Sequence, residues 1–256
     1  MDLGLTGARV LVTAGASGIG AAIARAFAAE GAKVHVCDVD GAGLGVMAQS
    51  GFTTSRCDVA DRASVAAMFE DVARALGGLD CLVNNAGIGG PTGRVDQIAP
   101  EDWDRTLEVD ITGQFNVTRL AVPLLMQSQN ASICNISSAA GRFGFALRTP
   151  YAAAKWAVIG FTKSLAIELG PHRIRANAIL PGLVDGKRQQ DVLAAKAQAA
   201  GISFDEMKRQ AMAKASIPEL IAPEQIAEQV VWLASSRART TSGQAIGIDS
   251  DLQSLS

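Results

Sequence analysis

Histidine, tyrosine and paired cysteines are scarce in this chain. Its 256 residues include two histidines, His35 and His172, and a single tyrosine. The four cysteines lie at least 20 positions apart, so there is no CxxC pair for zinc binding or thiol exchange. Histidine-based zinc centres and most Ser/His/Asp hydrolase sites would have to use one of the two histidines. We therefore expect no metal site and no histidine-based catalysis.

The chain also has no excess of charge and no long apolar run. Lys and Arg total 23 against 25 Asp and Glu, a formal net charge of −2, and no basic run indicates a nucleic-acid surface. No stretch approaches the roughly 18 apolar residues of a membrane span, and the start MDLGLTGARV lacks a signal-peptide pattern. We expect a cytoplasmic protein that acts on a small molecule, with neither a nucleic-acid nor a membrane partner.

Short β-branched runs alternate with helical patterns, which is typical of a parallel sheet with crossover helices. Ile19, Ile23 and Phe27 recur at helical spacing, and Gly31 and Gly77 stand where a left-handed residue would end a helix. No linker or repeat interrupts the pattern, so we predict an α/β fold: one doubly wound, Rossmann-type domain over residues 1–256, with a sheet of about seven strands. The predicted strands are Arg9–Thr13, Lys33–Asp38, Thr53–Asp58, Leu79–Asn84, Ala131–Ser137, Ile174–Leu180 and Gln244–Asp249.

Residues 183–222 are the least regular part of the chain. They are polar and rich in alanine, with one amphipathic piece near Phe204–Ala215. A long insertion between the last strands of such a sheet usually covers the carboxyl ends of the strands, where ligands bind. We predict a helical lid over the site; the alternative is a surface helical hairpin without a catalytic role.

A glycine-rich turn follows the first predicted strand and opens a helix. It has the sequence TAGASGIG over residues 13–20, and its candidate binding residues are Gly15, Ser17, Gly18, Ile19 and Gly20. Glycines let the backbone turn sharply and approach a pyrophosphate, which free N–H groups at a helix N-terminus can bind. The phosphate loop of ATP- or GTP-binding proteins needs a lysine after the last glycine, and this chain has alanine there. The pattern therefore favours a dinucleotide.

Asp38 ends the second predicted strand, 18 positions past Gly20. A carboxylate at this place can accept hydrogen bonds from both adenosine ribose hydroxyls and would repel a 2′-phosphate. No Lys or Arg occupies residues 14–17 or the position of Val39 to hold such a phosphate. We predict that the cofactor is NAD, not NADP, with Asp38 and Val39 beside its adenosine.

Tyr151 and Lys155 are four positions apart on one predicted helix, so their side chains share a face. The lysine ammonium favours the ionised phenol, and the pair can serve as a general base near neutral pH. Ser138, 13 residues earlier at a strand end, can hydrogen-bond a substrate oxygen. We predict that Tyr151 takes the hydroxyl proton of an alcohol while a hydride passes to a nicotinamide ring.

These motifs together resemble the short-chain dehydrogenase/reductase family over nearly the whole chain, from Gly7 to Gly247. The resemblance implies an adenine contact for Asp58, an adenosine-ribose contact for residues 85–87, a nicotinamide contact for residues 181–184 and a nicotinamide-ribose contact for Lys155. It also implies a homotetramer built through helices near Ile111–Gln127 and Tyr151–Gly170. The features that show the resemblance are the TAGASGIG turn, the CDV and NNAG sequences, Ser138 in NISS, the YAAAK sequence and the PG turn, and they add to the cofactor residues Asp58, Val59, Asn85, Ala86, Gly87, Pro181, Gly182 and Val184.

Three positions depart from the family pattern. Ala14 replaces the first glycine of the turn, which a backbone with negative φ would tolerate. Asp110, in VDITG, replaces an asparagine of the catalytic set; it can accept a hydrogen bond from Lys155 or a water but cannot donate one. Asp185 replaces a threonine after the PG turn, which removes a hydroxyl contact to the nicotinamide amide.

The predicted function is NAD-dependent interconversion of a secondary alcohol and a ketone, with Ser138, Tyr151, Lys155 and Asp110 in the catalytic set. One alternative is a carbonyl reductase of the 3-oxoacyl type, and a second, of another class, is a non-catalytic NAD-binding sensor or scaffold. Intact Ser, Tyr and Lys residues argue against the sensor.

Three arginines are candidates for holding an anionic substrate group. The alternative is that they pair with surface acids or with a neighbouring subunit. These arginines are Arg94, Arg142 and Arg148.

Overall fold

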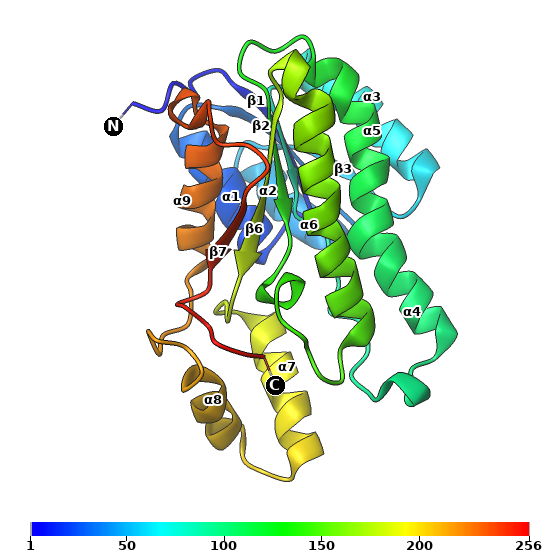
Figure 1. The fold of residues 1–256 in the computed structure, drawn as a ribbon. Coiled ribbons are helices and arrows are strands. Elements are labelled where there is room, and N and C mark those ends of the chain that lie inside the picture. The colour runs from blue at the N-terminus through cyan, green and yellow to red at the C-terminus, as the bar shows by residue number, and fades with distance from the viewer. Residues whose placement is uncertain (1, 256) are drawn as a thin grey trace.

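Seven parallel strands form one sheet in the order β3-β2-β1-β4-β5-β6-β7 (Figure 1), which confirms the predicted α/β architecture. The computed structural model describes residues 2–255, apart from the side chains of residues 188 and 199. The strand order reverses between β1 and β4, and ligands of doubly wound sheets bind at the carboxyl ends of the strands beside such a reversal. The strands are β1 (Arg9–Thr13), β2 (Lys33–Asp38), β3 (Thr53–Arg56), β4 (Cys81–Asn84), β5 (Ser132–Ile136), β6 (Arg175–Pro181) and β7 (Ala245–Ile248).

Helices cover both faces of the sheet. The helices α1 (Gly18–Ala29), α2 (Gly41–Gln49) and α9 (Pro223–Ala234) pack on one face, and α3 to α6 lie on the other (Figure 1). A π-helical turn, η2 (Glu108–Thr112), joins the fourth helix to the fifth. The helices are α1 (Gly18–Ala29), α2 (Gly41–Gln49), α3 (Arg62–Leu76), α4 (Pro100–Leu107), α5 (Gly113–Leu125), α6 (Thr149–Leu169), α7 (Lys187–Ala200), α8 (Phe204–Met212) and α9 (Pro223–Ala234).

Side chains of β1 alternate between two apolar cores. Val10 and Val12 pack in the core under α1 and α9, while Leu11 packs in the core under α3 and α5. The strand is buried on both sides because parallel strands with helices on both faces have no solvent side. Ile23 and Phe27 of α1 are fully buried, as their helical spacing predicts.

Two helix ends follow the predicted glycine chemistry. Gly31 and Gly77 have φ of 79° and 67°, the left-handed conformation that ends α1 and α3. The third strand is shorter than predicted, because pairing with β2 ends at Arg56. Beyond it the chain turns: the Cys57 N–H donates to the Asp38 carbonyl, and the Asp58 carboxylate accepts from the N–H of Ala60.

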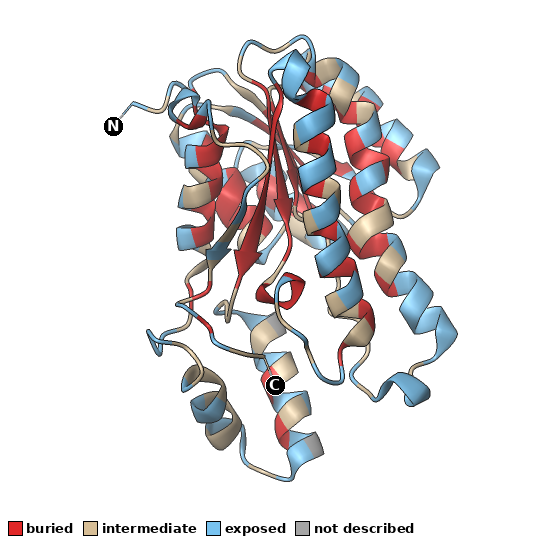
Figure 2. Cartoon of the chain, viewed as in Figure 1, coloured by how far each residue is buried: buried red, intermediate tan, exposed pale blue. Residues whose placement is uncertain are grey.

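The segment 183–222 forms α7 and α8, which lie beyond the carboxyl ends of the strands (Figure 1). Its predicted amphipathic piece is a helix that ends at Met212, three residues earlier than expected. Most residues of this segment are exposed or half-buried (Figure 2), whereas β4, β5 and β6 are buried throughout. Across the described part of the chain, every helix is too short or too polar to cross a membrane.

Candidate active site

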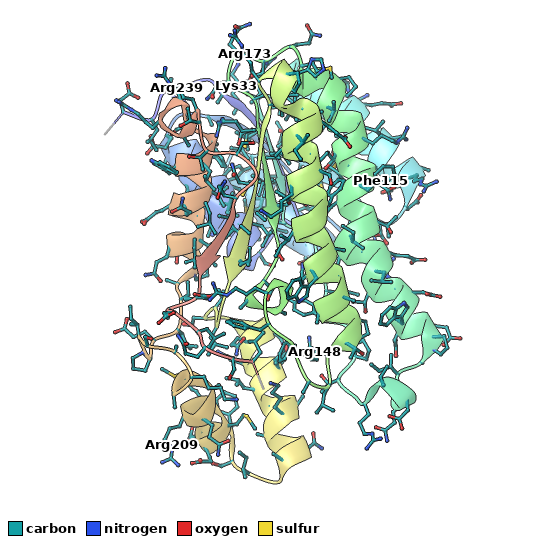
Figure 3. All side chains as sticks on the ribbon, in the orientation of Figure 1. Lys33, Phe115, Arg148, Arg173, Arg209 and Arg239 are labelled. Carbon is teal, nitrogen blue, oxygen red and sulfur yellow. The ribbon has the colours of Figure 1, made fainter. Side chains whose placement is uncertain are left out.

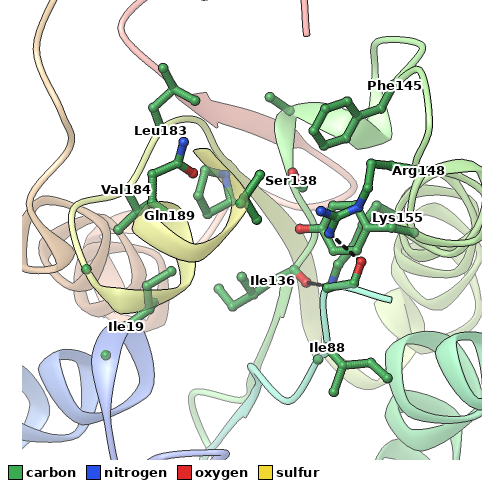
Figure 4. Close-up of a pocket in the computed structure, with 18 of the residues that line it drawn as sticks. Ile19, Ile88, Ile136, Ser138, Phe145, Arg148, Lys155, Leu183, Val184 and Gln189 are labelled. Atoms are coloured by element: carbon green, nitrogen blue, oxygen red, sulfur yellow. Dashed lines mark hydrogen bonds between the residues drawn. The ribbon is translucent and has the colours of Figure 1, made fainter. Parts of the chain in front are cut away.

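A cavity of about 1040 Å³ opens at the carboxyl ends of the strands. The turn after β1, the ends of β2, β5 and β6, the first turn of α6, and the helices α7 and α8 all contribute to its lining. Figure 4 shows Phe145 and Arg148 on one side of this space and Leu183, Val184 and Gln189 on the other. The predicted site residues that line it are Ser17, Gly18, Ile19, Asp38, Val39, Asp58, Val59, Asn85, Ala86, Gly87, Ser138, Arg148, Tyr151, Lys155, Pro181, Gly182 and Val184.

The glycine turn lies against the cavity and leaves no room for a side chain at Gly15 or Gly20. A Cβ on Gly20 would lie 2.2 Å from the Ala14 carbonyl oxygen, and one on Gly15 would lie 2.7 Å from Val36. Gly18 begins α1 with a φ of 51°, a conformation that glycine adopts without strain. Gly15 and Gly20 thus lie behind the lining, where they shape the turn.

The prediction for Ala14 is wrong. Its φ is +49°, so the backbone is left-handed at a position where we expected a negative φ. An alanine pays roughly 1–2 kcal/mol for this conformation, because its Cβ crowds the following carbonyl oxygen. The surrounding turn holds it there: the Asn85 side-chain amide donates to the carbonyls of Thr13 and Ala14 at 3.0 Å each.

Asp38 lies at the carboxyl end of β2 and closes one end of the cavity. One carboxylate oxygen accepts from the Ala16 N–H at 3.1 Å, and the other from the Asp40 N–H at 3.1 Å. Each oxygen keeps a lone pair for a further donor. The carboxylate is therefore fixed in position and can still bind hydroxyls.

Asp58 has a partner that the sequence did not predict, Arg105 of α4. The guanidinium donates to the Asp58 carboxylate at 2.8 Å, and Arg105 itself lines the cavity. Partial burial acts to raise the pKa of Asp58, but hydrogen bonds from the Ala60 N–H and Arg105 lower it by more, so the net pKa is below the ordinary value. Forty-seven positions separate the two residues, and only the fold brings them together.

Ser138 and Tyr151 line the same cavity from neighbouring elements. Ser138 follows β5, and its hydroxyl accepts from the Ala140 N–H at 3.1 Å. Tyr151 lies in the first turn of α6 and is half-buried. The neighbouring Ser137 hydroxyl donates to the Lys155 carbonyl at 2.7 Å, which fastens the end of β5 to α6.

Lys155 is buried behind Tyr151. Its Nζ lies 3.2 Å from an Asp110 carboxylate oxygen, donates to the Ile136 carbonyl at 3.3 Å and stands 5.5 Å from the Tyr151 ring centroid. The side chains of Lys155 and Asp110 are 4% and 0% exposed. Asp110 does not line the cavity; it belongs to η2, a π-helical turn of the kind that often occurs at functional sites.

The structure brings one of the three candidate arginines to the cavity. Arg94 pairs with Asp96 on the surface, and Arg142 pairs with Asp249 outside the lining. Arg148 is buried and lines the cavity, with its guanidinium carbon 5.5 Å from the Tyr151 ring centroid. The anion-binding prediction for Arg94 and Arg142 is not supported by where they lie.

Three further lysines line the cavity without having been predicted from sequence. They are Lys187 of α7, which pairs with Asp191 at 2.8 Å, Lys196 of the same helix, and Lys214, which follows α8. The sequence signal that could have indicated them is their place in the predicted lid, but nothing in their spacing shows which face they occupy. Among residues 2–255, no three His, Cys, Asp or Glu side chains converge as metal ligands would.

Comparison with known proteins identifies the family that has this fold and site. A family model described as enoyl-(acyl carrier protein) reductase matches residues 13–251. The chain belongs to the short-chain dehydrogenase/reductase family. It is 35% identical over 254 residues to a 3-oxoacyl-[acyl-carrier-protein] reductase of Thermotoga maritima, covering 97% of this chain and 98% of that protein. It is 34% identical over 253 residues to a D-beta-hydroxybutyrate dehydrogenase of Cupriavidus necator, covering 96% and 97%.

A solved relative has the same fold. An actinorhodin polyketide ketoreductase, crystallised as a variant with NADPH, superimposes with a TM-score of 0.92 at 31% identity, covering 96% of this chain and 97% of that one. This short-chain dehydrogenase/reductase is thus a nicotinamide-dependent oxidoreductase that interconverts secondary alcohols and ketones, as the sequence predicts. Membership argues against the sensor alternative.

Proposed function

We propose that the protein is an NAD-linked dehydrogenase of a secondary alcohol in which Tyr151 is the general acid and base. The observation that supports this most is the shared cavity: Asp38 lines one end of it and Ser138, Tyr151 and Lys155 line the other. A dinucleotide-binding turn and an acid–base pair therefore face the same space.

The residues present fit a nicotinamide dinucleotide. Gly18 lines the cavity at the start of α1, and a Cβ there would meet no protein atom within 4 Å, so the space beside this backbone is open to a ligand. The pyrophosphate would lie at the N-terminus of α1, and Asp38 would hold the adenosine ribose. Lys155 would hold the nicotinamide ribose, beside Pro181, Gly182 and Val184. When bound, the cofactor supplies the acceptor or donor of the hydride.

Tyr151 handles the proton. In oxidation the phenolate oxygen takes the proton of the substrate hydroxyl, and in reduction the phenol returns it to the forming alkoxide. Ser138 donates a hydrogen bond to the same substrate oxygen, which orients the carbinol. The buried Lys155 side chain lies beside the Tyr151 ring and is itself held by Asp110 and the Ile136 carbonyl.

The choice of NAD rests on charge. Asp38 would repel a 2′-phosphate, and the cation that lines the cavity nearby, Arg105, is paired with Asp58. The solved relative was crystallised with NADPH, and in this proposal Asp38 is the residue that favours NAD over NADP. Oxidation is the proposed direction; a 3-oxoacyl-type carbonyl reductase would use the same residues in reverse, and the similarity to the Thermotoga maritima protein favours it as the second candidate.

Two further features belong to this proposal. The segment 183–222, with α7 and α8 against the cavity, acts as a lid over the substrate. The working assembly is a homotetramer whose contacts include the outer faces of α5 and α6.

Replacing Asp38 by serine tests the cofactor choice. The variant loses the carboxylate that binds the ribose and repels a 2′-phosphate, so the ratio of kcat/KM with NAD to kcat/KM with NADP should fall roughly 10- to 100-fold. Absorbance of the reduced nicotinamide, with a panel of secondary alcohols, measures it. Asp40→Ser, two positions on, is the matched control and should leave the ratio unchanged. A wild-type preference for NADP would contradict the proposal.

A further inference from the structure

Three cations from three separate elements meet at the substrate end of the cavity. Arg148 precedes α6, Lys196 lies on α7, and Lys214 follows α8. All three line the same space as Tyr151. Arg148 belongs to the core of the domain, whereas Lys196 and Lys214 belong to the lid segment 183–222.

Two of the cations stand around one aromatic ring. The Arg148 guanidinium carbon is 5.6 Å and the Lys196 Nζ 4.5 Å from the centroid of Phe145. That ring contacts Tyr151 edge-on, with the two centroids 6.5 Å apart (Figure 4 shows Phe145 and Arg148 together). Arg148 therefore lies beside the Tyr151 ring itself, and Lys196 lies beside the Phe145 ring that contacts it.

Hydrogen bonds fix these two side chains. Arg148 donates to the Gly89 carbonyl and, at 3.4 Å, to the Thr92 hydroxyl. Lys196 donates to the Leu255 carbonyl at 3.2 Å. These contacts fix the positions of both charges beside the Phe145 ring.

Bringing the cations together has an electrostatic cost. Burial lowers the pKa of Lys196, and the charges of Lys214 and Arg148 lower it further. Three acids line the cavity among the described residues. Asp38 and Asp58 lie at its adenosine end, and Asp185 follows the PG turn. A cavity lined in this way attracts an anion.

We propose that the substrate is an anionic secondary alcohol, or the corresponding ketone, whose carboxylate, phosphonate or sulfonate is held by Arg148, Lys196 and Lys214. This inference rests on the proposed function, since it names the substrate class of the same site. The short distance from Tyr151 to Arg148 places the anion a few bonds from the carbinol carbon. Polyols and neutral cyclic alcohols are correspondingly poor substrates.

Matched substrate pairs test the charge preference. In the presence of NAD, kcat/KM for 3-hydroxybutanoate and 5-hydroxyhexanoate should exceed that for the corresponding amides roughly 10- to 100-fold, because an amide has the same shape without the charge. 2-Hydroxypropylphosphonate and 2-hydroxypropanesulfonate distinguish the kinds of anion. Equal values for acid and amide would overturn the proposal.

Variants assign the preference to the cluster. Lys196→Gln and Lys214→Gln should each reduce the acid-to-amide ratio about tenfold. Lys208→Gln, on α8 but outside the lining, makes the same charge change and should leave the ratio at the wild-type value. An unchanged ratio in both cluster variants would overturn the assignment.

Equilibrium binding separates this inference from the proposed function. Calorimetry of the NAD-loaded protein with hexanoate and hexanamide, neither of which can be oxidised at a carbinol, should show tighter binding of hexanoate. That result without turnover of any alcohol would contradict the proposed function while supporting the anion site. Turnover of neutral alcohols with no preference for hexanoate would overturn the anion site alone.

Discussion

Ala14 occupies a left-handed backbone conformation at the turn between β1 and α1. Replacing it by glycine removes the crowding of Cβ, partly offset by the greater freedom of glycine in the unfolded chain. We predict that Ala14→Gly raises the free energy of unfolding by about 1 kcal/mol and the Tm by about 2–4 °C. Thermal unfolding of the cofactor-free protein measures this.

An exposed helical alanine supplies the control. Ala28 lies in α1, where glycine should cost up to about 1 kcal/mol, so the Ala28→Gly variant should be less stable than the wild type. If Ala14→Gly were destabilising by a similar amount, the strain at Ala14 would be refuted.

Residues that share a local spacing could be predicted from sequence, and residues joined by the fold could not. Tyr151 and Lys155 are one helical turn apart, so their common face follows from the sequence. Arg105 reaches Asp58 from 47 positions away, and Lys196 reaches the Phe145 ring across 51. No periodicity encodes such contacts, and the positive φ of Ala14 likewise depends on how Asn85 ties down the turn.

A buried polar network joins β2, β3 and α3. The ring nitrogens of His35 lie 2.9 Å from the hydroxyls of Thr53 and Ser55, and Ser55 donates to Asp71 at 2.5 Å. Burial lowers the pKa of His35 from its ordinary 6.5 to about 4, although the charge of Asp71 opposes the shift. In the folded protein, His35 therefore stays neutral where an unfolded chain would bind a proton.

This network makes stability dependent on pH. As the pH falls below about 6.5 the unfolded state gains a proton that the folded state takes up only near pH 4, so stability is lost through this window. We predict a loss of about 2 kcal/mol between pH 7 and pH 5. Denaturant unfolding of the cofactor-free protein at the two pH values measures it.

The two histidines provide the variant and its control. His35→Gln cannot gain the proton, so most of the loss between pH 7 and pH 5 should disappear. His172→Gln alters an exposed residue beyond α6 and should retain the wild-type loss. The same loss in all three proteins would rule out His35 as its origin.

Element types were predictable because each has a distinct period, whereas element ends depend on turn contacts. β1 and β2 have the predicted bounds. β3 ends two residues early because the Asp58 carboxylate and the Ser64 hydroxyl form local hydrogen bonds beyond Arg56. Such side-chain bonds compete with strand pairing, and the pattern of apolar residues does not reveal them.

At the scale of the whole molecule, the outer faces of α5 and α6 expose large apolar side chains. Phe115 lies on α5 (Figure 3), and Trp156 and Ile167 lie on α6, 52% and 79% exposed. Both helices pack on the same face of the sheet (Figure 1). An apolar surface of this kind suits contact with another copy of the chain, in line with the proposed homotetramer.

Trp156→Glu tests the proposed assembly. A charge in the centre of an apolar contact is costly to bury, so the variant should sediment as a smaller species than the wild type at the same concentration. Val46→Glu, which places a charge on the exposed face of α2, should sediment like the wild type. A wild-type protein that sediments as a monomer would contradict the homotetramer.

The overall architecture was predictable because the alternation of strand and helix patterns leaves few ways to bury both faces of a parallel sheet. The position of α7 and α8 against the cavity was predictable only in outline, from the length of the insertion. Which lid side chains face the substrate depends on packing against Phe145 and the C-terminal segment.

The role of Tyr151 is the central claim, and the kinetics of Tyr151→Phe test it most directly. The variant keeps the ring and its packing but loses the oxygen that moves the proton. We predict that kcat falls about 10²- to 10⁴-fold while the Kd for NAD, measured by calorimetry, stays within about twofold of the wild type. A variant that retains wild-type turnover would contradict the account.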